Sequence, residues 1–167
     1  MGGFVANLLR LSRVPRCDEA AGDYLSNMDD LSRFHQAQTD VWPQALAELR
    51  SGAKCSHWMW FIFPQLRGLG RSATARRFGI ADLAEARAYL ADPVLGGRLR
   101  QAVATLLDHR DRSAQAILGP VDAVKLCSCA TLFEAAGGGA VFGELLEVFY
   151  DGRRCGLTQA LLRGENV

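Results

Sequence analysis

Start and stop signals of helices recur along this chain after Met28, whereas signals for β-strands are scarce. Pro43 suits the first turn of a helix, and an apolar stripe follows it as far as Gly52. Asp82 and Glu85 have the spacing of a capping box at the start of another helix. Apolar side chains at helical spacing predict further helices over residues 95–107, 122–133, 141–149 and 157–162. The sequence therefore predicts an all-α fold.

The length of 167 residues suits one domain with a sizeable hydrophobic core, so neither a metal nor a disulfide is needed to stabilise it. We expect a compact single-domain bundle of short and medium helices. The five cysteines are scattered without a Cys-x-x-Cys pair, which indicates reduced thiols in a cytoplasmic protein. Cys127 and Cys129 would lie on nearly opposite sides of a helix, whereas structural zinc needs four converging ligands. We predict no metal site and no cofactor.

Charge and hydropathy argue against two classes of partner. Nineteen basic against eighteen acidic residues give a net charge of +1, whereas a dedicated nucleic-acid surface usually carries a strong basic excess. The longest apolar run, residues 58–63, is far shorter than the ~20 residues that span a bilayer. We therefore expect neither a membrane partner nor a dedicated nucleic-acid surface.

The first 27 residues differ from the rest of the chain. Their short apolar stretch is interrupted by Arg10, Arg13 and Arg16 and lacks the long apolar centre of a signal peptide. We expect residues 1–27 to be an N-terminal extension, flexible or loosely docked, and residues 28–167 to form the helical domain.

The densest part of the sequence is the aromatic segment that begins at Ser56 and closes at Pro64. We expect a short buried helix here, because nothing else in the chain offers a partner strand. At least one of Trp58 and Trp60 should lie in the core, since large aromatic side chains of a single domain are more often core than pocket wall. The imidazole of His57 has two interpretations. It is either a general base or stacking partner, or a buried histidine that donates to a backbone carbonyl.

The glycine-rich turn that follows is a candidate anion site. Gly70 lets backbone amides approach a ligand, and Ser72 can cap the next helix, whose N-terminus attracts phosphate. Arg67 and Arg71 could bind oxygens in a bidentate manner. Gln65 adds a polar group at the near end of this turn. The alternative is a tight turn with solvated arginines.

Asp122, Lys125 and Ser128 are three residues apart on a predicted helix, so neighbours should touch along one side. A Lys–Ser pair activates a nucleophilic hydroxyl in some enzymes. An internal ion pair, with the serine bonding back into its own helix, explains the same residues. We expect Asp122, Lys125 and Ser128 to contact a ligand rather than to act in catalysis.

The run from Lys54 to Gln65, followed by Leu69, Gly70 and Ser72, resembles the signature of an uncharacterised family, domain of unknown function 1810. Phe34, Ala37 and Gln38 resemble the opening motif of that family, and residues 122–133 resemble its later helix motif. The resemblance covers almost everything after Met28. It implies a mostly helical fold and no established activity. Cys155 stands where the family usually has an aspartate, with Thr158 retained after it.

These observations favour binding of a small anionic ligand, phosphorylated or nucleotide-like, in a cleft beside the segment Ser56–Ser72. The candidate ligand contacts are Gln38, His57, Gln65, Arg67, Gly70, Arg71, Ser72, Lys125 and Ser128. One alternative is an enzyme that acts on such a ligand, with His57 or Lys125 in proton transfer. The other is a non-catalytic interaction module in which the same polar groups brace a helical core.

Overall fold

The computed structural model describes residues 31–165, and these residues form helices and no β-strand. The helices are α2 (Ser32–Thr39), α3 (Trp42–Ser51), α4 (Met59–Ile62), α5 (Ala73–Arg77), α6 (Leu83–Ala91), α7 (Leu95–Leu107), α8 (Ala114–Leu118), α9 (Pro120–Ala135), α10 (Ala140–Tyr150) and α11 (Gly156–Leu162). The all-α prediction is confirmed. The prediction of an extension over residues 1–27 lies outside the described residues.

The caps that the sequence predicts lie at the helix ends. Pro43 occupies the first turn of α3, and Gly52 ends that helix with a φ of 66°, a left-handed conformation that favours glycine. Asp82 caps α6 by accepting a hydrogen bond from the Glu85 amide at 2.9 Å. Two helices, α2 and α8, were not predicted; Ser113 caps α8 by accepting from the amide of the third residue after it.

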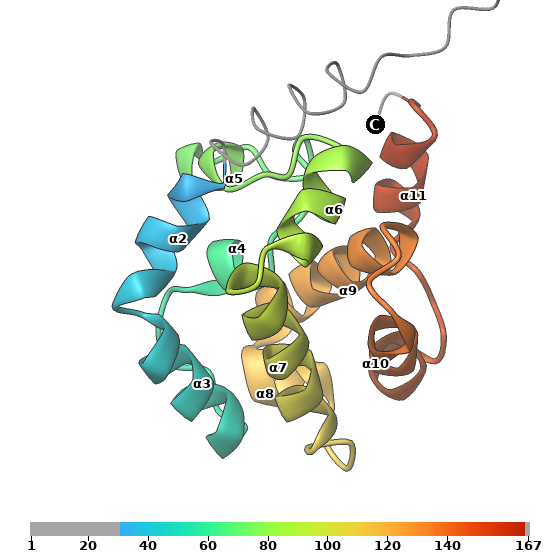
Figure 1. Ribbon diagram of the computed structural model, residues 1–167. Coiled ribbons are helices and arrows are strands. Elements are labelled where there is room, and N and C mark those ends of the chain that lie inside the picture. The colour runs from blue at the N-terminus through green and yellow to red at the C-terminus, as the bar shows by residue number, and fades with distance from the viewer. Residues whose placement is uncertain (1–30, 166–167) are drawn as a thin grey trace, which may run out of the picture.

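Helices α7 and α9 organise the bundle, and the others pack around them (Figure 1). Helix α7 contacts α3, α4, α6 and α10, while α9 contacts α6, α8, α10 and α11. Because α6 and α10 touch both central helices, the two halves of the bundle share one core.

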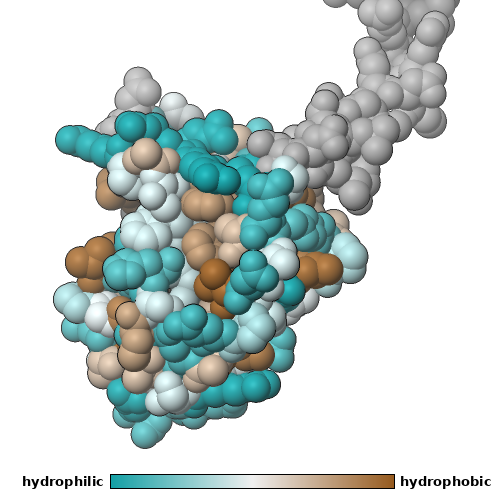
Figure 2. All heavy atoms as spheres, turned by 90° about the vertical axis from the view of Figure 1, so that its left-hand side faces the viewer, coloured by the Kyte–Doolittle hydropathy of each residue, from teal (hydrophilic) through white to brown (hydrophobic). Residues whose placement is uncertain are grey.

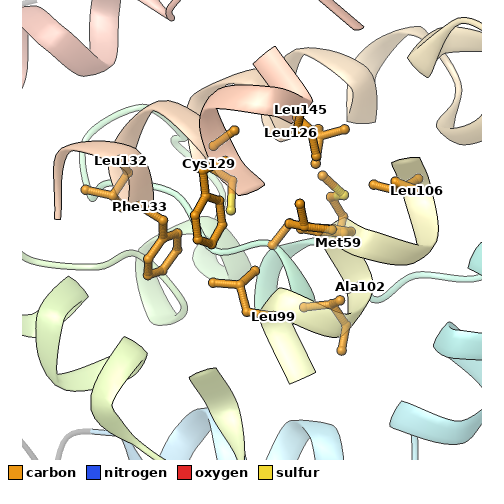
Figure 3. Close-up of a cluster of buried hydrophobic side chains, with 14 of the residues drawn as sticks. Met59, Leu99, Ala102, Leu106, Leu126, Cys129, Leu132, Phe133 and Leu145 are labelled. Carbon is orange, nitrogen blue, oxygen red and sulfur yellow. The ribbon is translucent and has the colours of Figure 1, made fainter. Parts of the chain in front are cut away.

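Side chains of the short helix α4 pack between the two central helices. Figure 3 shows Met59 among side chains of both, namely Leu99, Ala102 and Leu106 of α7 and Leu126 of α9. Trp58 and Met59 are fully buried, whereas Trp60 is half-buried. The prediction of a short buried helix is confirmed. So is the expectation that at least one tryptophan belongs to the core.

After α4 the chain makes an excursion, residues 67–79, which includes α5. A single parallel bridge between Leu66 and Ile80 closes it: the Arg67 amide donates to the Ile80 carbonyl at 2.7 Å, and the Ile80 amide donates to Gln65 at 2.8 Å. Gly79 lies where the two ends meet, and a Cβ at this position would be 2.9 Å from the Arg67 Cα. The excursion is thus held at its base, which fixes its position against α9 and α11.

The surface is polar over most of the face that carries α2 and α3. Figure 2 shows hydrophobic residues there in small separate groups among hydrophilic ones. Scattered apolar residues are normal for a solvated face, so this side of the molecule indicates no particular partner. Within residues 31–165, no helix combines the length and apolar character needed to cross a membrane.

Candidate functional site

A pocket of about 490 Å³ lies between the excursion, the first half of α9 and the start of α11. We call it the apolar pocket, because most of its lining is hydrophobic: Trp60, Leu66, Leu69, Ala75, Phe78, Pro120, Val121, Val124 and Leu157. The rest of the lining is polar or glycine: Gln65, Gly70, Gly79, Lys125, Ser128 and Cys155. Its volume and its few polar groups are typical of a small-molecule site.

A second, more polar hollow of about 320 Å³ adjoins the apolar pocket. It is lined by Lys54, Ser56, His57 and Asp122, together with residues that also line the apolar pocket, among them Trp60 and Lys125. A ligand at this junction could place an apolar part in the pocket and a polar part in the hollow.

The junction contains a compact charge cluster. The Asp122 carboxylate accepts a hydrogen bond from Lys125 Nζ at 2.7 Å through one oxygen and pairs with Lys54 Nζ at 2.7 Å through the other. These are the only two lysines of the chain, whose other basic residues are arginines and histidines. Burial raises the pKa of the Asp122 carboxyl, but hydrogen bonds from Lys125 and Lys54 outweigh burial and hold that pKa below its usual range. One carboxylate shared by two ammonium groups leaves a net positive charge at the junction.

Each lysine of this cluster also covers a tryptophan ring. Lys125 Nζ lies 4.1 Å from the centroid of Trp60, and Lys54 Nζ lies 4.9 Å from that of Trp58. Such cation–π contacts hold an ammonium group against the ring face. Trp60 therefore lines the pocket with the positive charge of Lys125 over one face of its ring.

Glu48 of α3 fixes the segment that supplies Lys54. Its carboxylate accepts hydrogen bonds from the Cys55 and Ser56 amides at 2.8 and 3.0 Å, from Ser56 Oγ at 2.6 Å and from Trp58 Nε1 at 2.8 Å. Burial raises the pKa of Glu48, but these hydrogen bonds outweigh it and lower the pKa to about 2. The carboxylate stays charged at neutral pH and pins the loop before α4.

The far end of the apolar pocket is formed by Ser128 and Cys155. The buried Ser128 hydroxyl is 3.2 Å from both the Val124 carbonyl oxygen and Cys155 Sγ. The Cys155 amide donates to Thr131 Oγ1 at 2.9 Å, which anchors the start of α11 on α9. Burial raises the pKa of the Cys155 thiol, but hydrogen bonds, the strongest from Ser128, outweigh it, and the net shift is downward.

Of the nine candidate ligand contacts, five line these two cavities, as does Asp122, which we expected beside Lys125 and Ser128. Gln65, Gly70, Lys125 and Ser128 line the apolar pocket, and His57 and Lys125 line the polar hollow. His57 is exposed, so its interpretation as a buried histidine is wrong. The expected pair of Lys125 with Asp122 is present, and the Ser128 hydroxyl bonds back to its own helix at Val124.

The other predicted contacts lie outside both linings. Gln38 is buried, where its amide donates to the Phe61 carbonyl at 2.6 Å and to the Tyr89 hydroxyl at 2.9 Å. Ser72 caps α5 by accepting from the Ala75 amide. The side chains of Arg67 and Arg71 are exposed, and Arg67 donates to the Gly79 carbonyl at 3.4 Å.

Several lining residues were not among the predicted contacts, chiefly Lys54, Trp60 and Cys155. No local signal marks Lys54, because its partner Asp122 lies far from it along the chain. Cys155 stood out only as a departure from the family pattern, and its contact with Ser128 of α9 had no local signal.

The fold and the site together define a small all-helical protein with a ligand-sized pocket between its helices. The chain belongs to the family described as "Protein of unknown function (DUF1810)", which it matches over residues 28–162. It is similar to the conserved hypothetical protein Rv1873 from Mycobacterium tuberculosis, whose crystal structure shares 47% sequence identity and a TM-score of 0.79. That similarity covers 80% of this chain and 96% of the other. Among curated proteins, none matches the chain.

Proposed function

We propose that this protein binds a small molecule with a flat apolar ring and an anionic group, as a nucleotide-like ligand has. The ring lies in the apolar pocket against Trp60, and the anionic group lies beside Lys125 at the polar hollow. The observation that carries this proposal is the Lys125 amine over the Trp60 ring at the junction of the two cavities.

The apolar lining supports a ring-shaped ligand. Val121, Val124 and Leu157 border the pocket with exposed fractions of 68%, 64% and 56%, which are large for apolar side chains. A ring inserted between them and Trp60 would remove this surface from water. Stacking on an aromatic ring adds about 0.5–1.5 kcal/mol beyond the burial of area.

The charge cluster supports an anion rather than a cation. Lys54, Lys125 and Asp122 carry one net positive charge, and their side chains are 9%, 19% and 15% exposed. A negative group placed there would neutralise this excess in partly desolvated surroundings, where ion pairs are screened less than at an open surface. The ammonium groups are already positioned by Asp122 and the tryptophan rings, so binding need not order them.

The chain's two lysines make a direct test available. The full chain is acetylated with a dilute amine-reactive ester, and modification of Lys54 and Lys125 is read separately by mass spectrometry. The probes are adenosine monophosphate and anilinonaphthalene sulfonate, each titrated to saturation. We expect both probes to slow acetylation of Lys125, because an anionic group at its ammonium hides the amine.

Variants then locate the anion contact. Lys125→Met keeps the side-chain stem over Trp60 and removes the charge, and we expect it to weaken both probes by about tenfold or more, the loss of one charged contact. Arg71→Met is the matched control, since Arg71 is exposed and outside both linings. If the two variants bound the probes with equal affinity, or if only Arg71→Met bound them more weakly, the anionic group would not bind at Lys125. Saturable binding of neither probe would refute the proposed ligand class.

A further inference from the structure

A buried hydroxyl without a partner lies one turn into α11. Thr158 is fully buried, and among the described residues its Oγ1 has no hydrogen-bond partner. Buried hydroxyl groups in proteins nearly always have a partner, so an orphan calls for an explanation. An acceptor oxygen within hydrogen-bond distance would satisfy the Thr158 hydroxyl.

The thiol of Cys155, at the start of α11, is the group on which Thr158 acts. Thr158 follows it by three residues, and its hydroxyl lies close enough to the sulfur to lower the pKa of the thiol, although Oγ1 does not have the geometry of a full hydrogen bond. The Ser128 hydroxyl approaches the same sulfur at 3.2 Å. A thiol accepts hydrogen bonds poorly, and Cys155 makes no capping bond to α11. The Ser128 and Thr158 hydroxyl groups thus both lie near a thiol sulfur that is only a weak hydrogen-bond acceptor.

We propose that Cys155 is an oxidation site, where hydrogen peroxide converts the thiolate to a sulfenic and then a sulfinic acid whose oxygens accept hydrogen bonds from Ser128 and Thr158. In the first step the thiolate attacks one peroxide oxygen. The S–O bond forms as the O–O bond breaks, hydroxide leaves, and sulfur loses two electrons to the peroxide. In the second step the sulfenate attacks another peroxide molecule in the same way and becomes a sulfinate, with water as the final by-product.

Access and reactivity favour Cys155 over its neighbours. It is half-buried and lines the apolar pocket, which gives peroxide a path to the sulfur. Burial raises the pKa of Cys127 and of the fully buried Cys129, whereas hydrogen bonds lower that of Cys155 in spite of its burial. The thiolate is the form that reacts with peroxide, so Cys155 should react before these two. This proposal does not depend on which ligand the pocket binds.

Peroxide titration of the full chain tests the proposal. Cysteines are followed individually by mass spectrometry, with dimedone added in parallel samples to trap sulfenic acid. We expect Cys155 to gain one oxygen and then two, ahead of Cys127 and Cys129. Thr158→Val keeps the shape of the side chain and removes the orphan hydroxyl, and it should slow formation of the sulfinic acid about tenfold, the loss of one hydrogen bond to an anion.

A substitution cycle tests the same contacts without peroxide. Cys155→Asp supplies two carboxylate oxygens in place of the sulfinate, and we expect it to raise Tm by about 2–4 °C, the gain from about one hydrogen bond. In the Thr158→Val background the gain should be smaller, because one donor is missing. The matched control is Cys127→Asp, which we expect to lower Tm, since that thiol contacts the Arg153 carbonyl oxygen.

Three results would overturn the proposal. The first is oxidation of Cys127 or Cys129 before Cys155. The second is a Cys127–Cys155 disulfide as the main product in place of the sulfinic acid. The third is a Tm gain of Cys155→Asp that is the same with and without the Thr158 hydroxyl, because the orphan group would then have no part in holding the oxygens.

Discussion

The hydrogen bonds to Glu48 predict a stability difference that depends on pH. The Glu48 carboxylate accepts from the Cys55 and Ser56 amides, from Ser56 Oγ and from Trp58 Nε1. In the Glu48→Gln variant an NH2 group replaces one of the accepting oxygens, so at least one of these donors faces another donor. We expect the variant to fold with a loosened loop before α4.

The magnitude follows from the pKa of Glu48, which is lowered from 4.5 to about 2. One pKa unit corresponds to about 1.4 kcal/mol, which sets an upper limit of about 3.5 kcal/mol on the stabilisation. The side chain is only partly buried, and solvent screening reduces this, so we expect about 1–2 kcal/mol at neutral pH. Because the folded pKa is the lower one, the stabilisation is complete above pH 4.5 and is lost as the pH falls toward about 2.

Urea unfolding followed by tryptophan fluorescence measures the effect. The difference between wild type and Glu48→Gln should be about 1–2 kcal/mol near neutral pH and should shrink below about pH 4. Glu144→Gln is the matched control, because Glu144 forms an exposed pair with Arg110 at 3.1 Å, and such pairs contribute little. A Glu48→Gln difference that stays constant with pH, or that equals the Glu144→Gln difference, would refute the reasoning.

Three further variants test the fold and the pocket. Trp58→Ala should cost about 3–5 kcal/mol in urea unfolding because Trp58 is fully buried, whereas Trp60→Ala should cost about 1–2 kcal/mol and mainly weaken binding of anilinonaphthalene sulfonate; the opposite order would reverse their assignment to core and wall. Gly79→Ala should lower the unfolding free energy by about 1–3 kcal/mol, since its Cβ would lie 2.9 Å from a backbone carbon of the facing loop, while Gly97→Ala, with nothing within 4 Å, should be neutral or stabilising. A chain that starts at Met28 should keep its Tm within about 2 °C in calorimetry, because the family match begins there; a larger drop would show that residues 1–27 pack on the domain.

The all-α fold could be predicted because its signals are local. A proline in the first turn, a glycine at the end and an aspartate at the N-cap act within a few residues of themselves, as Pro43, Gly52 and Asp82 do here. The contact of Lys125 with Asp122 was predictable for the same reason, since residues three apart on a helix are neighbours. Local signals thus account for the fold and for half of the charge cluster.

The rest of the site depends on contacts between distant parts of the chain. Lys54 reaches Asp122 only because the loop before α4 packs beside the start of α9, and no spacing in the sequence encodes that. Periodicity could not separate the buried Trp58 from the half-buried Trp60, because α4 is one turn long. The glycine turn had the composition of an anion site, yet its serine caps α5, and neither of its arginines lines the two cavities.

The contacts of the site form one continuous chain from α3 to the pocket. Glu48 holds the loop that carries Lys54, Lys54 pairs with Asp122, and Asp122 holds Lys125 over the Trp60 ring. Each link is made by protein groups, so the protein itself positions the Lys125 ammonium and the Trp60 ring that the proposed ligand would contact. A site ordered in advance favours a rigid ligand and loses affinity when a distant link is broken. Glu48→Gln should therefore weaken probe binding at Lys125 although Glu48 lines neither cavity, while Glu144→Gln should leave it unchanged. Unaltered binding in Glu48→Gln would mean that Asp122 and Trp60 position Lys125 without help from α3.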